Sequence, residues 1–205
     1  MPAIDELETA ARSVIKIETE TGRGSGNVIA HVGNNSYVLT CKHVIDDEPG
    51  MRVQVVRREG KRFVSTPGIV ERCDPKHDLA IVRTSRRIPV PAIGLADKEP
   101  ELYEPLYSVG CGSGFYGLAA RALLTALDGS AGEAGATGYL YTGLCINGMS
   151  GGALIDEDGA LVGVIEAMDR NGHLPVWSIG HAVPLPAIKA FLRNPSKFAK
   201  GKKSA

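Results

Sequence analysis

The stretch Asn147-Gly148-Met149-Ser150-Gly151-Gly152-Ala153-Leu154 places one serine among three glycines. Glycine lets the chain turn tightly, so the backbone amides of Gly148 and Ser150 are able to point into one shared oxyanion hole. Glycine-flanked serines also occur in many ordinary turns, and the stretch by itself favours that simpler interpretation. Its chemical meaning therefore depends on whether the chain supplies partners for Ser150.

Two upstream segments supply such partners. His43 stands near the end of the apolar run 37–45, and Asp78 stands at the start of the apolar run 77–82. A serine hydroxyl needs a neighbouring base, an imidazole acts as a base near neutral pH, and a carboxylate orients the ring. The order His, Asp, Ser is that of the chymotrypsin arrangement and differs from the subtilisin and α/β-hydrolase orders. The three residues together predict a triad of nucleophile Ser150, general base His43 and orienting Asp78.

The chain resembles the trypsin-like serine peptidases and, within them, the HtrA type. The similarity spans roughly residues 12 to 193. The resemblance implies a serine endopeptidase that acts on protein or peptide substrates, with the amides of Gly148 and Ser150 as its oxyanion hole. It rests on residues 22–29, 39–44, 77–82 and 147–154, with further matches at residues 105–110 and 180–184.

The pattern of short apolar runs predicts an all-β chain. Runs rich in Val and Ile, separated by Gly, Asn, Asp and Pro, are typical of short antiparallel strands. The resemblance implies that they form two antiparallel six-stranded β-barrels of the chymotrypsin kind, with a short N-terminal helix and a C-terminal helix. The expected strands are residues 14–18, 26–32, 36–39, 52–57, 63–71 and 79–83, then 106–110, 119–126, 138–141, 153–155, 161–167 and 174–180.

We expect one peptidase unit over residues 1–205. Its parts are a first barrel at about 13–88, a second barrel at about 100–183, a closing helix at about 184–193 and a disordered basic tail at 194–205. His43 and Asp78 then come from the first barrel and Ser150 from the second. Folding of the two barrels against each other is therefore expected to assemble the site.

The composition excludes several classes of function. With 23 basic and 23 acidic side chains, the formal net charge is zero, so the chain lacks the basic footprint of a nucleic-acid-binding protein. No apolar run suits a membrane span, and the acidic start lacks the features of a signal peptide, which predicts a cytoplasmic location. We expect neither a metal nor a cofactor, and reduced, buried thiols at the cysteines, which lack zinc-type spacing: Cys41, Cys73, Cys111 and Cys145.

The resemblance also implies where a substrate side chain binds. The family pattern places the residue six before the serine at the base of the specificity pocket, and here it is Leu144. An apolar floor offers no partner to a buried ammonium or guanidinium group, which predicts cleavage after small or medium apolar side chains. Glu166 complicates this interpretation, and His181 leaves open a preference for acidic or glutamine side chains. The implied substrate-binding residues are Leu144, Ile165, Glu166, Ala167 and Met168.

Several departures from the related families bear on regulation. Met149 stands where digestive enzymes carry the aspartate that pairs with a newly cut N-terminus, so we expect activity without zymogen cleavage. Only about a dozen residues follow Leu192, so we expect no PDZ module, and no aromatic residue precedes Tyr37 to build the trimer contacts of HtrA proteins. A separately encoded partner is one way to target or activate such a core. Two alternatives stay open, namely an esterase with the same triad and a non-catalytic or partner-gated scaffold.

Overall fold

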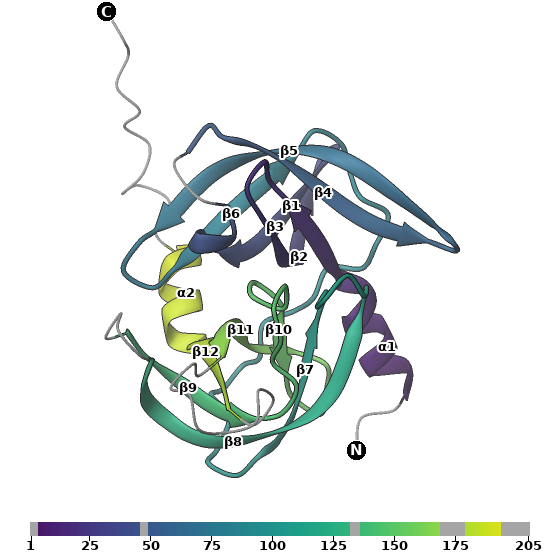
Figure 1. Cartoon of the computed structure of the whole chain (residues 1–205). Coiled ribbons are helices and arrows are strands. Elements are labelled where there is room, and N and C mark those ends of the chain that lie inside the picture. The colour runs from purple at the N-terminus through teal and green to yellow at the C-terminus, as the bar shows by residue number, and fades with distance from the viewer. Residues whose placement is uncertain (1–3, 46–48, 132–135, 169–178, 194–205) are drawn as a thin grey trace, which may run out of the picture.

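Two closed antiparallel barrels form the body of the computed structural model, which describes residues 4–45, 49–131, 136–168 and 179–193 (Figure 1). Helix α1 (Ile4–Ser13) precedes the first barrel and helix α2 (Leu185–Arg193) follows the second. The strand order is β1-β2-β3-β6-β5-β4 in the first barrel and β10-β11-β12-β9-β8-β7 in the second. The predicted fold class, two six-stranded barrels with two helices, is therefore confirmed for the described residues.

The first barrel shows the inward and outward alternation that strands impose on side chains. In β4, Val53 and Val55 are buried whereas Arg52 and Gln54 are exposed. A single-turn 3₁₀ helix, η1 (Lys42–Val44), directly follows β3. The strands of this barrel are β1 (Val14–Glu18), β2 (Arg23–Val32), β3 (Asn35–Cys41), β4 (Arg52–Glu59), β5 (Arg62–Asp74) and β6 (Leu79–Thr84).

The second barrel encloses its own apolar core, in which Tyr139 and Tyr141 are among the largest fully buried side chains. One of its strands, β11, contains a bulge, because Ile165 pairs with Ala182 while Ala167 pairs with His181, the next residue along β12. Glu166 is the extra residue of this bulge. The strands are β7 (Pro105–Gly110), β8 (Leu118–Ala131), β9 (Ala136–Thr142), β10 (Ala153–Ile155), β11 (Leu161–Met168) and β12 (Gly180–Pro184).

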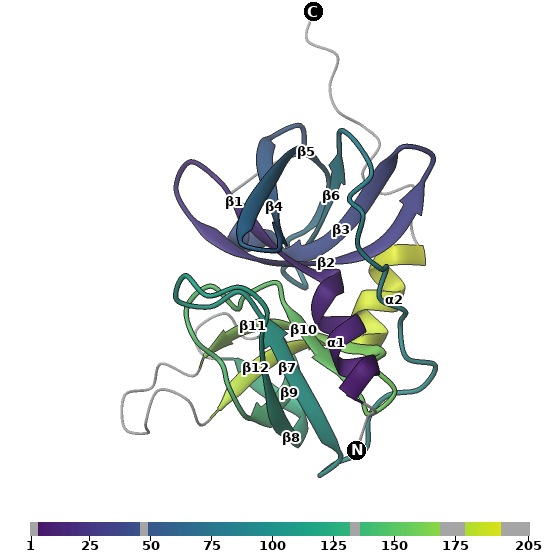
Figure 2. The same ribbon diagram turned by 90° about the vertical axis from the view of Figure 1, so that its right-hand side faces the viewer.

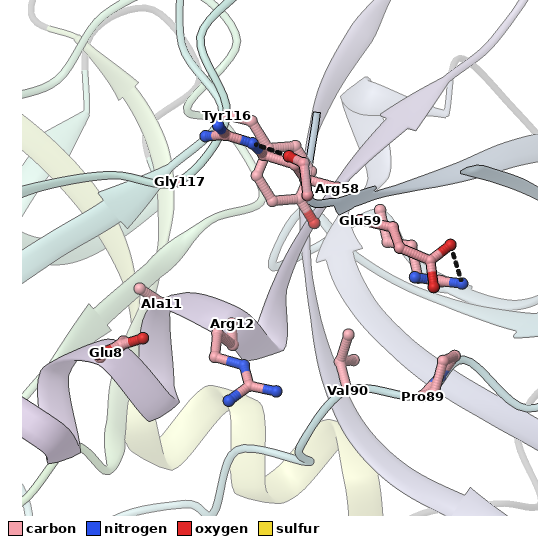
Figure 3. A pocket seen from close by; sticks show the side chains of 11 residues that line it. Glu8, Ala11, Arg12, Arg58, Glu59, Pro89, Val90, Tyr116 and Gly117 are labelled. Carbon is pink, nitrogen blue, oxygen red and sulfur yellow. Dashed lines mark hydrogen bonds and ion pairs between the residues drawn. The ribbon is translucent and has the colours of Figure 1, made fainter. Parts of the chain in front are cut away.

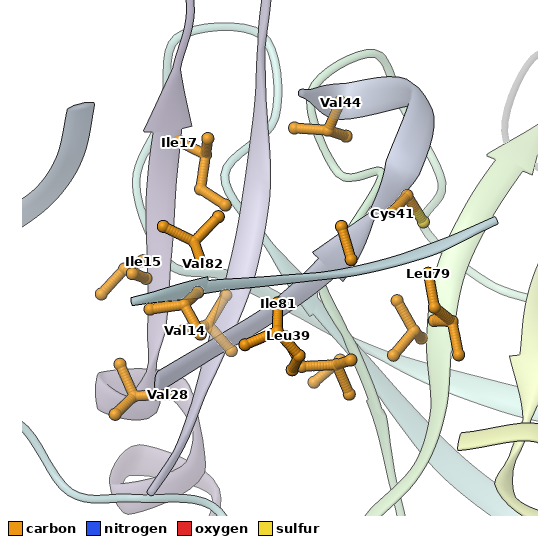
Figure 4. Packing of buried hydrophobic residues seen from close by; sticks show 14 of the residues in the cluster. Val14, Ile15, Ile17, Val28, Leu39, Cys41, Val44, Leu79, Ile81 and Val82 are labelled. Carbon is orange, nitrogen blue, oxygen red and sulfur yellow. The ribbon is translucent and has the colours of Figure 1, made fainter. Parts of the chain in front are cut away.

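The two barrels share one buried seam. Figure 2 shows the first barrel above the second, with α1 and α2 beside the junction. The main apolar cluster runs from the inside of the first barrel (Figure 4) to residues of the second, such as Val109 and Val164, and to Ile188 and Phe191 of α2. Ile188 and Phe191 lie three residues apart on one face of α2, the spacing that lets a helix bury one side. The barrels are thus fixed against each other by apolar packing.

The structure corrects the last predicted strand. The sequence predicted residues 174–180, whereas β12 is Gly180–Pro184, paired with both β11 and β9. Pro184 ends this strand because proline has no amide hydrogen to donate, and α2 begins at the next residue. Most of the predicted strand, and all of the predicted tail 194–205, lie outside the described residues. In the part of the chain that the structure covers, no helix has the length and apolar character to cross a membrane.

Candidate active site

His43 and Asp78 meet at the rim of the first barrel. His43 lies in η1, directly after β3, and Asp78 directly precedes β6, the strand that pairs with β3. The Asp78 carboxylate accepts hydrogen bonds from the ring Nδ1 of His43 at 2.5 Å and from the backbone amide of His43 at 2.9 Å. Because Nδ1 donates here, the other ring nitrogen, Nε2, carries the lone pair that can take up a proton.

The backbone of Asp78 is fixed in an unusual conformation. Its φ is 51°, in the left-handed region that aspartate tolerates better than most residues. Its carbonyl accepts a hydrogen bond of 2.9 Å from the amide of Lys42. Backbone and side chain of Asp78 thus both bond to η1 and help to hold the His43 ring in its orientation.

The glycines around Ser150 are required by backbone geometry. Gly148 and Gly151 have φ of +94° and +83°, which side-chain-bearing residues rarely adopt. A Cβ atom at Gly148 would lie 2.6 Å from the carbonyl oxygen of Cys111, and one at Gly151 would lie 2.1 Å from that of Ser25. The amide of Met149 donates to the Ile146 carbonyl, whereas those of Gly148 and Ser150 donate to no other described residue. The turn therefore leaves the two predicted oxyanion donors available.

The turn at residues 147–152, here called the serine turn, packs against the same strand as η1. Gly24, on β2, lies between η1 and this turn, because a Cβ atom there would lie 2.6 Å from Cγ1 of Val44 and 2.9 Å from the carbonyl oxygen of Ser150. The next residue, Ser25, donates its amide to the same Ser150 carbonyl at 2.7 Å. The structure therefore places the serine turn of the second barrel beside the 3₁₀ turn that carries His43.

Three buried polar residues of the first barrel hold the serine turn. The hydroxyl of Ser25 donates to the Gly148 carbonyl at 2.7 Å and accepts from the Cys111 amide at 2.8 Å. The Asn27 side-chain amide donates to the Gly151 carbonyl at 2.9 Å, and the Thr40 hydroxyl donates to the Ser25 carbonyl at 2.7 Å. Polar side chains within the otherwise apolar strands β2 and β3 are the signal in the sequence by which these three supporting residues could have been predicted.

Replacing Ser25 with alanine tests this support. The change leaves the Gly148 carbonyl and the Cys111 amide without their partner, so we expect the free energy of unfolding to fall by about 2–3 kcal/mol. We also expect kcat on a peptide substrate to fall about tenfold, because the Gly148 amide is one of the two predicted oxyanion donors. Urea denaturation and steady-state kinetics measure the two effects. Ser65→Ala, at an exposed serine of β5, is the control, and a Ser25→Ala protein that behaves like this control would contradict the assigned support.

A second set of contacts ties the serine turn to β11. The Ile165 carbonyl accepts hydrogen bonds from the amide of Gly151 at 2.7 Å and from the thiol of Cys41 at 3.2 Å, and the Ile165 amide donates to the Gly152 carbonyl at 2.9 Å. Cys41 is the last residue of β3, two positions before His43. The start of the β11 bulge thus lies between the serine turn and the strand that leads to His43.

The five predicted substrate-binding residues have different environments. Leu144 is half-buried and packs against the second core. Ile165 is fully buried, so its side chain is part of the core and its backbone, as described above, is what holds the serine turn. Glu166 is half-buried in the bulge. Ala167 and Met168 belong to β11, and their side chains lie outside the described residues.

Burial and charge act on two ionisable groups beside the His43–Asp78 pair. Burial, with a further contribution from the negative charge of Asp78, raises the pKa of the Glu166 carboxyl, and His43 acts in the opposite direction. Burial, together with the carboxylates of Asp78 and Glu166, raises the pKa of the Cys41 thiol well above its ordinary value. Cys41 therefore stays protonated and acts as a hydrogen-bond donor.

The same residues include a grouping of metal-ligand types. The Cys41 sulfur, a ring nitrogen of His43 and a carboxylate oxygen of Asp78 lie within 4.8 Å of one another. Metal coordination would require the Cys41 thiolate, which the raised pKa disfavours, and Asp78 already bonds to His43. The chemistry of this donor set therefore suits an oriented imidazole better than a metal ion.

A separate hollow of about 640 Å³ lies between α1 and the end of β4 (Figure 3). Glu8 and Arg12 reach it from α1, Arg58 and Glu59 from β4, and Tyr116 from the loop before β8. Its described lining shares no residue with the predicted site. Because its charges are mixed, it gives no indication of a particular ligand.

Most of the chain matches one known protein family. The family described as "Trypsin-like peptidase domain" matches residues 24–164, which include His43, Asp78 and Ser150. The chain belongs to the trypsin-like peptidase domain family. The solved structures agree on the fold of this trypsin-like domain. An inactive form of the Rv3671c protease superposes with a TM-score of 0.74 at 22% identity, covering 96% of this chain and 93% of that one.

Curated relatives of this trypsin-like domain include HtrA-type proteases, which confirms the predicted HtrA-type resemblance. The putative protease Do-like 14 of Arabidopsis thaliana is 27% identical over 83% of this chain. The mitochondrial serine protease HTRA2 of Drosophila pseudoobscura pseudoobscura is 30% identical over 86%, and the periplasmic serine endoprotease DegP of Salmonella typhimurium is 30% identical over 81%. The chain spans 40%, 40% and 34% of the lengths of these relatives.

Proposed function

We propose that this trypsin-like domain is a serine endopeptidase in which Ser150 attacks the scissile carbonyl, His43 accepts the serine proton and Asp78 orients His43. The observation that carries the proposal is the pair of hydrogen bonds that the Asp78 carboxylate accepts from the ring and from the backbone amide of His43. They direct the basic nitrogen away from Asp78, as a general base for a serine requires. Family membership supports the same assignment.

The proposed reaction uses groups that this chain supplies. Attack by the Ser150 oxygen forms a bond to the carbonyl carbon, and the serine proton moves to Nε2 of His43. The amides of Gly148 and Ser150 donate to the carbonyl oxygen as it gains negative charge, and each such donor typically contributes about 3 kcal/mol to lowering the barrier. His43 then gives the proton to the leaving amine as the C–N bond breaks. Water attacks the acyl carbon next, its proton moves to His43, and His43 returns that proton to the Ser150 oxygen as the acyl–oxygen bond breaks.

The direct test is covalent labelling with a fluorophosphonate probe, combined with cleavage of an unfolded protein substrate. We expect the wild-type chain to label and to cleave. A chain that labels and hydrolyses esters but leaves peptides intact would favour the esterase alternative. A folded chain that neither labels nor cleaves would favour the non-catalytic scaffold.

We further propose that the substrate side chain before the scissile bond is small or medium and apolar. The half-buried Leu144 supports this, because an apolar surface gives no partner to a cation. Burial and the charge of Asp78 raise the pKa of the Glu166 carboxyl, a shift that disfavours the charged form a basic substrate side chain would need. A peptide library should show apolar residues preferred over Lys and Arg by more than about tenfold. A cleavage profile dominated by Lys or Arg would contradict this preference.

Activation and location form a last part of the proposal. Met149 is fully buried, and Val14–Glu18 is paired on both sides as β1, so neither is placed to respond to a newly cut N-terminus. We propose that the domain acts in the cytoplasm without cleavage, with a separately encoded partner serving to target it. Labelling of the purified chain, with its intact mass verified, tests whether the uncleaved chain is active on its own. Labelling confined to a shortened chain or to a complex would contradict such activity.

A further inference from the structure

Glu166 occupies a special position at the barrel junction. It is the extra residue of the β11 bulge, so it has no partner opposite on β12. The carbonyl of the preceding residue, Ile165, is held by the Gly151 amide at 2.7 Å and by the Cys41 thiol at 3.2 Å. The peptide unit that begins Glu166 is therefore fixed between the serine turn and the end of β3. Bulges commonly serve to redirect a side chain beside an active site.

The backbone places Glu166 close to the His43–Asp78 pair, because the Cys41 sulfur that donates to the Ile165 carbonyl lies within 4.8 Å of a ring nitrogen of His43 and a carboxylate oxygen of Asp78. The carboxyl of Glu166 is half-buried there. Burial and the charge of Asp78 raise its pKa, and His43 lowers it. The thiol of Cys41, on β3, is influenced by both carboxylates and stays neutral. The other ionisable groups on elements packed against β11 are Tyr37 on β3, His181 on β12, and Lys189 and Arg193 on α2. Lys189 donates to the Asp97 carbonyl.

We propose that Glu166 is a positioning residue of the catalytic site, a second carboxylate whose negative charge stabilises the protonated imidazole of His43 together with Asp78. The inference rests on the proposed peptidase function and extends it. A protein of this kind needs one carboxylate to orient the ring, and Asp78 already does so through hydrogen bonds. Glu166 adds charge at the junction, supplied by the second barrel.

The direction in which Glu166 shifts the pKa of His43 follows from the charges of the two groups. Ionised Glu166 favours imidazolium over imidazole, so it raises the pKa of His43. His43 must be neutral to accept the serine proton, so the acid limb of the pH dependence of kcat/KM follows this pKa. Removal of the Glu166 charge should therefore move the acid limb to lower pH.

The variant Glu166→Gln tests the inference, because glutamine keeps the size of the side chain and removes the charge. In a Ser150→Ala background, the His43 imidazole is titrated by NMR with and without Glu166→Gln. We expect the pKa of His43 to fall by about half a unit or more, given a charge acting through a partly desolvated site. In the active protein, we expect the acid limb of kcat/KM to move by the same amount, with kcat at neutral pH several-fold lower and KM unchanged.

Glu101→Gln serves as the matched control, because Glu101 is exposed and lies outside the junction. It should leave both the His43 pKa and the acid limb unchanged. An unchanged His43 pKa in Glu166→Gln would overturn the inference, and so would a change confined to KM or to cleavage preference, which would assign Glu166 to substrate binding. The NMR arm does not require activity. Absence of hydrolysis would therefore count against the proposed function alone, while the titration still decides the role of Glu166.

Discussion

Replacing Ser150 with alanine is expected to abolish fluorophosphonate labelling and to lower kcat/KM for peptide hydrolysis by about five to six orders of magnitude. Loss of a nucleophile that acts with its base as one unit has an effect of this size. The fold should be unaffected, because the Ser150 carbonyl, which accepts a hydrogen bond from the Ser25 amide, is kept in the variant. Thermal unfolding should therefore give a midpoint close to that of the wild type.

The measurement is labelling and peptide cleavage by wild-type and variant chains at equal concentration. Ser65→Ala should label as strongly as the wild type, because Ser65 is an exposed serine whose hydroxyl bonds to Gln54. Persistent labelling of folded Ser150→Ala would place the nucleophile elsewhere in the chain. That result would contradict the proposed triad while leaving the barrel fold intact.

Replacing Asp78 with asparagine is expected to lower kcat by about 10⁴-fold near neutral pH, with little effect on folding. Asparagine tolerates the positive φ of this position, and its carbonyl oxygen can still accept from the His43 amide. Its NH₂ group would then face Nδ1 of His43. The ring would have to accept there and carry its proton on Nε2, so it could no longer act as the base for Ser150.

The chain contains a matched control for this variant. Asp74 accepts a hydrogen bond from Nδ1 of His77 at 2.7 Å, which makes a second His–Asp pair close to the first in sequence. His77 is not part of the proposed site, so Asp74→Asn should change kcat by less than about threefold. Steady-state kinetics on one peptide compare the two variants. Equal losses in both would indicate a general effect on this loop and would contradict a specific role for Asp78.

Much of the fold was predictable because its signals are local. Most predicted strands overlap observed ones, since alternating apolar residues and turn residues between them depend on the near sequence. The Asp-Gly pair at residues 158–159 is typical of a tight turn between strands, and Gly159, with φ of +77°, lies between β10 and β11. The last strand was misplaced because the end of β12 is set by Pro184 and by pairing with distant β9.

The supporting residues of the site were less accessible to sequence reasoning. The hydrogen bonds of Ser25 and Asn27 reach the serine turn more than a hundred residues further along the chain, and Thr40 supports the turn indirectly through Ser25. No local sequence pattern reveals these partners. Glu166 was predicted as a pocket residue, and its relation to His43 and Asp78 depends on the bulge in β11. Ile165 was predicted to contact the substrate, whereas its side chain is fully buried.

The sequence alone determined the chemical types and their order: a histidine, an aspartate and a glycine-flanked serine, together with the strand pattern that builds two barrels. These features are local, because a turn needs its glycines and a strand its alternation wherever they lie. Only the tertiary structure decided which groups meet. The apolar seam between the barrels brings the serine turn against Gly24 and Ser25, and it brings Ile165 of β11 against Cys41 at the end of β3. Such contacts arise from packing between segments distant in the chain, which no local pattern encodes.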